Sequence, residues 1–332
     1  MNIRNRRELK HFAAERLENA RNVSKIVLIY AAAALGLSAL VTVVSYVLGL
    51  QVENLGGLSN MGKKNFLTTL QSMLPFASNL VSMCLELGLL AVMLRVARGQ
   101  YVSEQTLRLG FDRFWVLLRC NLIRLLIFAG ALFASVYLGI MIYMITPLSN
   151  SAVALLEPYL SSASILSGSL VLEEGVYAQF AVAVWPAYLI CGVLFAVVAV
   201  PMLYSYRMAN YILIDKPGMG AMAALRASKQ MTRHNRVSLF RLDLSFWWYY
   251  LVLGLAQVLL YGDLLLPSFG VTLPGNGDVW YFVFYAAYLL ATLAVYWFLR
   301  SRVEVAYALA YDSVKPEEPK QDGVVLGNIF QM

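Results

Sequence analysis

Residues 26–50 read IVLIYAAAALGLSALVTVVSYVLGL, a stretch without a single charged side chain. At about 1.5 Å per helical residue it is long enough to cross a hydrocarbon core of about 30 Å. It is too long for the apolar core of a cleavable signal peptide, and it lacks an evident small-x-small cleavage site. We therefore interpret it as a retained signal anchor and as the first of several membrane spans.

The rest of the chain has the same character. Of its 332 residues, 60% are hydrophobic and 14% are charged, whereas a soluble domain has about 45–50% apolar and about 25% charged residues. Further apolar runs of spanning length follow at 74–94, 116–146, 178–206, 240–262 and 279–299. The sequence predicts an all-α, polytopic membrane protein whose membrane domain, 26–312, holds six transmembrane helices.

The basic residues predict the orientation of these spans. The chain has 26 Lys and Arg against 19 Asp and Glu, a net charge of +7. The Lys and Arg residues gather in the N-terminal segment, the second and fourth loops and the C-terminal end, whereas the loops 147–176 and 263–278 contain no Lys or Arg. The positive-inside rule then places both termini in the cytoplasm. The excess charge is expected to face anionic lipid rather than nucleic acid.

Two basic segments outside the spans have an amphipathic pattern. Residues 1–25 are expected to form a basic amphipathic cytoplasmic helix, with Leu9, Phe12 and Leu17 near helical spacing. A second surface helix is expected over 217–236, begun by Pro217. Its apolar side would hold Met222, Leu225 and Met231, and its cytoplasmic basic face Arg226, Lys229, Arg233 and Arg236. We expect both helices to lie at the inner leaflet.

Two remaining segments are less apolar than the spans. The third loop, 147–176, is acidic and rich in Ser and Leu, which favours an external cap on the helix ends. The tail 313–332, with Pro316 and Pro319 among acidic residues, is expected to be a disordered cytoplasmic tail.

Glu86 is the most informative single residue, because a carboxylate in mid-membrane is costly unless it is paired, protonated or facing water. Counting from Arg98 places it about 18 Å in from the cytoplasmic edge. We predict an intramembrane charge pair between Glu86 and Arg124, or between Glu86 and Arg119. A structural clamp between helices and a substrate or proton site both remain open. Near the cytoplasmic ends, Asp243, Glu304 and Asp312 are expected to pair with Arg241, Arg300 or Arg302.

Pro186 and Pro201 lie in the run 178–206. Because proline removes a helical hydrogen bond, they predict a kink or a break. Broken helices form substrate sites in some transporters, but prolines are also ordinary in membrane helices, so both interpretations stay open.

Signatures of catalysis are scarce. The chain has two histidines, His11 and His234, both in predicted surface segments without a neighbouring ligand set. The zinc-protease, nucleophile-elbow and Walker motifs are missing, and the cysteines Cys84, Cys120 and Cys191 are far apart. A loose Gly-x-Gly-x-x-Ala match at 218–223 follows a membrane surface rather than a strand. We expect no enzyme, no metal site and no cofactor.

Several segments carry a family resemblance. They are Arg7-Glu8-Leu9-Lys10, the run 204–213 into Asp215 and Pro217, the run 224–248, and the pairs Ala306-Tyr307 and Ala310-Tyr311. From about residue 5 to 312 the chain resembles the bacterial integral-membrane family catalogued as domain of unknown function 975. It departs where the family often has Pro-Gly, here Pro201-Met202, and where it tends to have Gly-Asn-Lys, here within 233–236. The resemblance implies a multi-helix membrane protein and no established activity.

Two functions from different classes follow from these patterns. The first is a non-enzymatic membrane scaffold or accessory subunit, whose partners are anionic lipid and another membrane protein or a second copy of the chain. The second is a transporter or export component for a small or hydrophobic substrate, which would use the region of Glu86 and Arg124.

Overall fold

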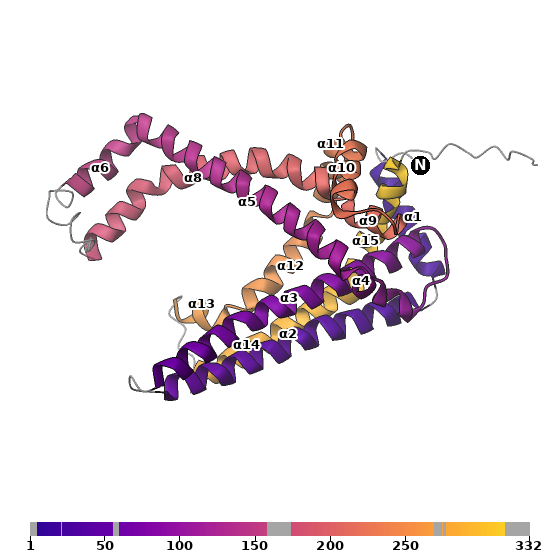
Figure 1. Cartoon of the computed structure of the whole chain (residues 1–332), viewed down its shortest axis with the longest axis horizontal. Coiled ribbons are helices and arrows are strands. Elements are labelled where there is room, and N and C mark those ends of the chain that lie inside the picture. Colours follow the sequence, from indigo (N-terminus) through magenta and orange to yellow (C-terminus); the bar gives the residue numbers. More distant parts are fainter. Residues whose placement is uncertain are drawn as a thin grey trace, which may run out of the picture. The chain divides into compact units, whose positions relative to one another are not determined.

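The computed structural model describes residues 5–20, 22–55, 60–157, 174–268, 274 and 277–315. Every regular element in these ranges is helical, which confirms the all-α prediction for them. The chain divides into two units, described one at a time (Figure 1): unit 1 is Met1–Leu118 with Met208–Met332, and unit 2 is Arg119–Arg207. The elements that begin in unit 1 before residue 119 are α1 (Arg6–Asn19), α2 (Val23–Asn54), α3 (Met61–Ala97), η2 (Glu104–Arg108), α4 (Leu109–Asp112) and α5 (Phe114–Ile145). Then follow η3 (Pro147–Ser149), α6 (Asn150–Leu156), α8 (Glu174–Tyr206), α9 (Ala209–Asp215), α10 (Ala221–Thr232), α11 (Arg236–Leu244), α12 (Trp247–Leu259), α13 (Gly262–Ser268), α14 (Gly277–Val295), η5 (Tyr296–Arg300) and α15 (Ser301–Val314).

Membrane-spanning length is reached by five helical stretches of the described chain. They are Val23–Asn54, Met61–Ala97, Phe114–Ile145, Gln179–Asp215 and Gly277–Val314. Each contains one of the predicted apolar runs or most of it. The lengths and composition of these helices agree with a protein embedded in a membrane.

The predicted run at 240–262 is not a single straight helix. Its place is taken by α11 and α12, which are bent by 59° relative to each other. At the break the Phe246 amide donates to Asp243 O at 2.8 Å, and the Ser245 carbonyl accepts Lys10 Nζ at 2.7 Å instead of a helical amide. A lysine far away in the sequence thus satisfies the backbone group that the bend releases.

The first interhelical loop is also shorter than hydropathy indicates. The helix α3 begins at Met61, well before the apolar run at 74–94, so Lys63 and Lys64 lie in its first turn. Polar residues such as Lys, Thr and Gln are compatible with a helix but lower its hydropathy. Hydropathy therefore locates the apolar part of a helix and not its ends.

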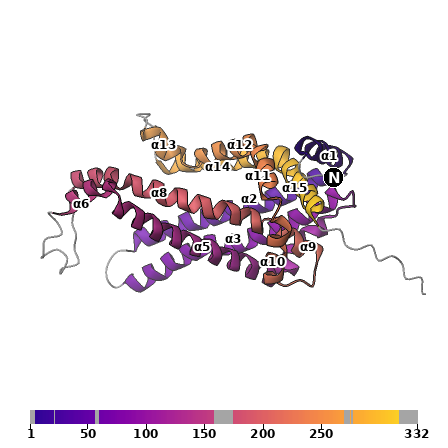
Figure 2. The same cartoon turned by 90° about the horizontal axis from the view of Figure 1, so that it is seen from above.

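In unit 1, α2, α3 and α14 run side by side, as the two views show together (Figures 1 and 2). The second half of α3 is almost entirely enclosed by protein, since Val92 and Met93 are fully buried. Two glycines permit this close packing. A Cβ on Gly88 would overlap the carbonyl oxygen of Leu107, and one on Gly110 would overlap that of Cys84. These contacts hold η2 and α4 against α3.

The N-terminal helix α1 packs on α15 and α3. Leu9 is 0% and Ala13 is 2% exposed, so the central apolar positions of α1 contact protein and not lipid. Only Phe12 of the predicted apolar face is an exposed large side chain in this helix. The prediction that this face contacts the inner leaflet is therefore wrong for Leu9, because the helix bundle covers that side chain.

Unit 2 consists of α8 and most of α5, with α6 between them in the chain. Tyr143, Ala152 and Ala187 form its core cluster, and the Tyr143 hydroxyl donates to Ala183 O at 2.9 Å. Pro186 and Pro201 both lie inside α8, which continues through them without a break, and the alternative of a kink stays a prediction. Of the predicted cap over 147–176, the structure describes residues 147–157 and 174–176. The predicted disordered tail lies outside the described residues from 316 onward.

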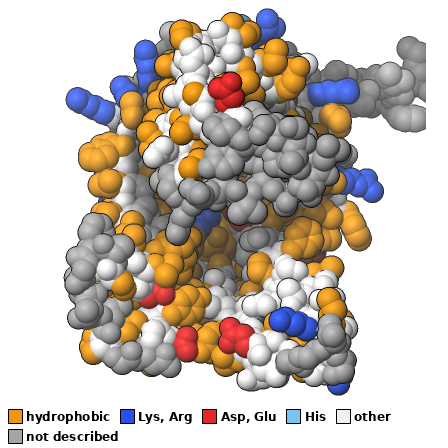
Figure 3. Space-filling view, turned by 90° about the vertical axis from the view of Figure 1, so that its left-hand side faces the viewer, with side chains coloured by type: hydrophobic (Ala, Val, Ile, Leu, Met, Phe, Trp, Pro, Cys, Tyr) orange, Lys and Arg blue, Asp and Glu red, His pale blue; other side chains and the backbone are white. Residues whose placement is uncertain are grey.

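Much of the described surface is apolar. Figure 3 views the molecule from the side on which α6 lies, and hydrophobic side chains cover large areas with few acidic or basic ones. On α5 and α8, Phe133 and Val182 are each at least three-quarters exposed. Such surfaces are ordinary where lipid is the solvent and unusual in water.

Candidate functional site

A buried arginine at the junction of α14 and α15 forms the most unusual charged site. Arg300 ends η5, which is a π-helical turn, and the residue is 8% exposed. Its Cζ lies 5.0 Å from the ring centroid of Tyr30 and 4.5 Å from that of Tyr296. Two aromatic faces therefore stabilise the cation. Such π-helical turns are frequent at functional sites.

Two carboxylates from different parts of the chain complete this site. The Arg300 guanidinium lies 3.5 Å from Glu86 Oε1 and 3.7 Å from Glu304 Oε1. The Glu304 contact confirms the expected i,i+4 pair, whereas the Glu86 contact was not foreseen from the sequence. The Glu86 side chain is 55% exposed, so the contact joins a buried cation to an accessible anion. Because Tyr30, Glu86 and Arg300 come from three helices, the site can act as a clamp between them.

The predicted partners of Glu86 belong to the other unit. Arg119 and Arg124 lie on the part of α5 in unit 2, whereas Glu86 lies in unit 1. The pairing of Glu86 with either of them stays a prediction. The sequence predicts Arg300 as a partner of nearby carboxylates but not of Glu86, because its position at the end of an apolar run indicates a membrane boundary. The continuation of that helix to Val314 could not be read from hydropathy.

A second charged cluster fixes the end of unit 1 that contains α1, α9 and the end of α15. We call Arg98, Asp215, Asp312 and Lys315 the charge cluster. Arg98 Nη2 lies 2.7 Å from Asp312 Oδ1, and its Nη1 lies 2.8 Å from Asp215 Oδ1. Lys315 Nζ lies 2.8 Å from Asp215 Oδ2. These contacts join the ends of α3, α9 and α15.

The charges in this cluster support one another. The hydrogen bonds to Asp312 and then to Asp215 raise the pKa of the Arg98 guanidinium against the opposing effect of burial. Next to it, Tyr311 donates to Asp215 Oδ2 at 3.2 Å and stacks on Tyr211 with ring centroids 5.4 Å apart. Asp312 is thus paired with Arg98 rather than with Arg241, Arg300 or Arg302 as expected, because α15 continues past the predicted end of the span.

The helix α10 carries the predicted basic face at the same end of unit 1. Ala224, Leu225 and Ser228 are buried, so the opposite side of the helix is the outer one. Its cationic side chains Arg226, Lys229 and Arg233 are exposed, whereas Arg236 is half-buried at the start of α11. The predicted apolar side is wrong in one position, since Met222 is exposed and the smaller Ala224 packs instead.

A polar pocket lies between α1 and the segment that follows α3. Its volume is about 680 Å³, and Arg16, Asn19, Asn22 and Gln100 line it together with Gly99. Gly99 has a φ of +69°, and a Cβ there would lie 2.6 Å from Arg16 Nη1. Glycine therefore both permits the turn and leaves room for the arginine.

The described residues contain no group of three or more His, Cys, Asp or Glu side chains placed to hold a metal ion. The charged groups described above instead form pairs and clusters of opposite sign. Their chemistry suits the recognition of charge and the joining of helices.

Comparison with known proteins identifies one family. Residues 1–317 match the family model described as "Protein of unknown function (DUF975)". No curated protein matches the chain, and no solved structure does.

Proposed function

Starting from the fact that the chain belongs to the DUF975 family, we propose that it is a non-enzymatic scaffold or accessory subunit of the bacterial cytoplasmic membrane. In this proposal both termini are cytoplasmic, and unit 1 presents its basic face to anionic lipid of the inner leaflet. Another membrane protein or a second copy of the chain would dock beside that lipid. The exposed cations of α10 on a fixed support are the observation that carries the proposal.

The helix α9, on which α10 packs, is fixed at its end by two ion pairs. This helix ends at Asp215, which Arg98 and Lys315 both bind at 2.8 Å. A cationic surface that does not move loses little conformational entropy when a lipid headgroup binds. Each Lys or Arg near an anionic surface contributes about 1 kcal/mol. Arg226, Lys229 and Arg233 together are therefore sufficient for a marked preference.

The test compares the removal of two exposed cations of α10 with a substitution at the same positions that keeps their charge. The full chain is placed in nanodiscs that hold anionic and zwitterionic lipid, and the retained lipids are identified by native mass spectrometry. The double variant Arg226→Gln/Lys229→Gln should lose about 2 kcal/mol, or about 30-fold, of its anionic preference. The matched variant Arg226→Lys/Lys229→Arg keeps both charges and should keep that preference. Equal retention in both variants would contradict the proposal.

Glu86 favours a second candidate function, a transporter or export component. An accessible carboxylate beside a buried cation within a spanning helix is an arrangement found on ion and proton pathways. Proteoliposomes with a pH-sensitive dye inside would show proton flux in the original chain and a large loss in Glu86→Gln. Flux that is absent, or equal in both proteins, would argue against this candidate.

A further inference from the structure

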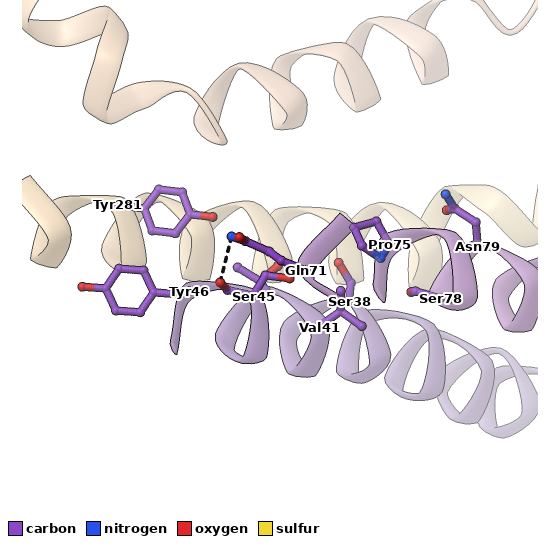
Figure 4. Close-up of a pocket in the computed structure, with 10 residues that line it drawn as sticks. Ser38, Val41, Ser45, Tyr46, Gln71, Pro75, Ser78, Asn79 and Tyr281 are labelled. Atoms are coloured by element: carbon purple, nitrogen blue, oxygen red, sulfur yellow. Dashed lines mark hydrogen bonds between the residues drawn. The ribbon is translucent and has the colours of Figure 1, made fainter. Parts of the chain in front are cut away.

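Within unit 1, a cavity of about 460 Å³ lies among α2, α3 and α14. On α2, its wall carries hydroxyls at Ser38, Thr42 and Ser45, one face of the helix at i, i+4 and i+7. Figure 4 shows this face turned toward Gln71 of α3. The stretch 26–50 is otherwise almost purely apolar, so three hydroxyls on one face mark this part of the helix as different.

The α3 wall is also polar. Gln71 Nε2 donates to Ser45 O at 3.0 Å, and Ser78 lies two turns farther along α3 on the same side of the cavity (Figure 4). Pro75, between them, has no amide hydrogen, so the Gln71 carbonyl does not receive its usual helical hydrogen bond. The cavity is therefore bordered by donors and acceptors from both helices.

One polar group in this wall has no partner in the described protein. Ser38 Oγ and Thr42 Oγ1 lie 3.0 and 2.9 Å from the Tyr285 hydroxyl of α14, which satisfies both. Ser45 Oγ is buried and has no hydrogen bond among the residues that the structure describes. A buried polar atom in a membrane-spanning helix is costly unless water or a ligand reaches it.

The lining restricts the chemistry of such a ligand. Among the described residues that line it there is no Asp, Glu, Lys or Arg, so none of them brings a charge with which to hold an ion, a phosphate or a carboxylate. Tyr46 and Tyr281 lie near each other at one end of the cavity (Figure 4). Hydroxyls and amides beside aromatic rings match a ring that is apolar on its faces and polar at its edges. The volume falls within the range of about 300–1,000 Å³ that is typical of small-molecule sites.

We propose that this cavity binds an uncharged polyhydroxyl group of sugar size, either as the headgroup of a glycolipid or as a free sugar. Ser78 provides a hydrogen bond to its hydroxyls, Ser45 provides another when its side chain turns Oγ from its buried position into the cavity, and Tyr46 and Tyr281 contact its ring. This site is separate from the basic face of α10, so it does not rest on the proposed function given above.

The experiment uses the full chain in nanodiscs that contain glucosyl-diacylglycerol or plain diacylglycerol, with and without free glucose in the buffer. Native mass spectrometry measures the bound lipid. Ser45→Ala removes a hydroxyl, with exposed Ser24→Ala on the same helix as its control. Ser78→Leu fills the cavity, with its exposed neighbour Ala77→Leu as the matched control. Thermal unfolding of each variant shows whether the bundle remains intact.

We expect the original chain to retain the glucosyl lipid over the plain one. Loss of one hydrogen bond of about 1 kcal/mol in Ser45→Ala should reduce that preference about fivefold. Ser78→Leu should abolish it, and both controls should keep it. Displacement by glucose would identify a free sugar as the ligand, whereas resistance to glucose would identify the lipid headgroup.

The proposal is overturned if the original chain binds neither glucosyl lipid nor glucose, or if Ser78→Leu and Ala77→Leu behave alike while both remain folded. The anionic preference of the basic face is measured with different lipids and different variants. A failure of either proposal is therefore recognised without reference to the other.

Discussion

The two halves of α3 differ although both are helical and both carry apolar residues. From Leu87 to Ala97 the helix is enclosed by α1, α15, η2 and α4, and Val92 and Met93 are fully buried. In the first half, Met73 is 62% and Phe76 is 66% exposed, and Gln71 borders a polar cavity. The same helix therefore serves as the core of a packed end of unit 1 and, in its first half, as the wall of a polar cavity.

This difference teaches that hydrophobicity does not decide what surrounds a membrane helix. An apolar side chain is stable against lipid and against protein, because the lipid chains are themselves apolar. The enclosed half of α3 differs from the first half because a small residue and a charged residue fix other elements against it. Gly88 allows η2 to approach closely, and Arg98 ties the end of α3 to Asp215 and Asp312.

The largest expected effect is the removal of a core side chain from the enclosed half. Met93→Ala should lower the free energy of unfolding by about 2–5 kcal/mol, because it leaves a cavity that neighbours cannot fill. Met73→Ala, in the exposed half, should change it by at most about 0.5 kcal/mol. Chemical denaturation of both variants in the same detergent measures the difference. Equal losses would show that the two halves are packed alike.

Next in size is the removal of the cation that joins α3 to α9 and α15. Arg98→Gln leaves two carboxylates beside Lys315 alone, and partial exposure of the cluster moderates the cost. We expect a loss of about 1.5–3 kcal/mol, the range for hydrogen bonds to charged groups. The exposed Arg108→Gln is the control, and it should unfold like the original chain.

A smaller effect should follow from adding one methyl group to a glycine. Gly88→Ala places a Cβ where it overlaps the carbonyl oxygen of Leu107, so η2 must shift. Overpacking of this kind costs about 1–3 kcal/mol. Gly62→Ala on the same helix meets nothing within 4 Å and should be neutral or slightly stabilising. If the two variants unfold at the same temperature, the close approach of η2 to α3 is wrong.

The smallest effect concerns the docking of α1. Lys10 Nζ donates to the Ser245 carbonyl at 2.7 Å and lies 4.3 Å from the ring centroid of Phe246. Burial lowers the pKa of this ammonium group, and the charge of Arg6 lowers it further. Both effects offset part of the stability that the hydrogen bond and the ring contact contribute. Lys10→Met should therefore cost only about 1 kcal/mol and should speed amide exchange in α1. Unchanged exchange there would show that Lys10 does not hold the helix.

The sequence was sufficient for the helical class and for most of the apolar helices, because length and hydropathy determine both. It could not give the bend between α11 and α12, since the Ser245 carbonyl is satisfied by Lys10 from a distant part of the chain. Nor could it give Arg300 as a partner of Glu86, because the helix continues through a π-helical turn past the apolar run. The cavity had one visible signal, the spacing of Ser38, Thr42 and Ser45 on one face.

The orientation of unit 1 in the membrane is the central claim of the proposed function, and it can be measured directly. Single variants Lys229→Cys and Lys63→Cys place thiols on exposed positions of α10 and of the first turn of α3. A membrane-impermeant maleimide is then applied to intact cells and to inverted membrane vesicles. The account predicts that Lys63→Cys is labelled in intact cells and Lys229→Cys only in inverted vesicles. Labelling of Lys229→Cys from outside intact cells would contradict a basic face at the inner leaflet.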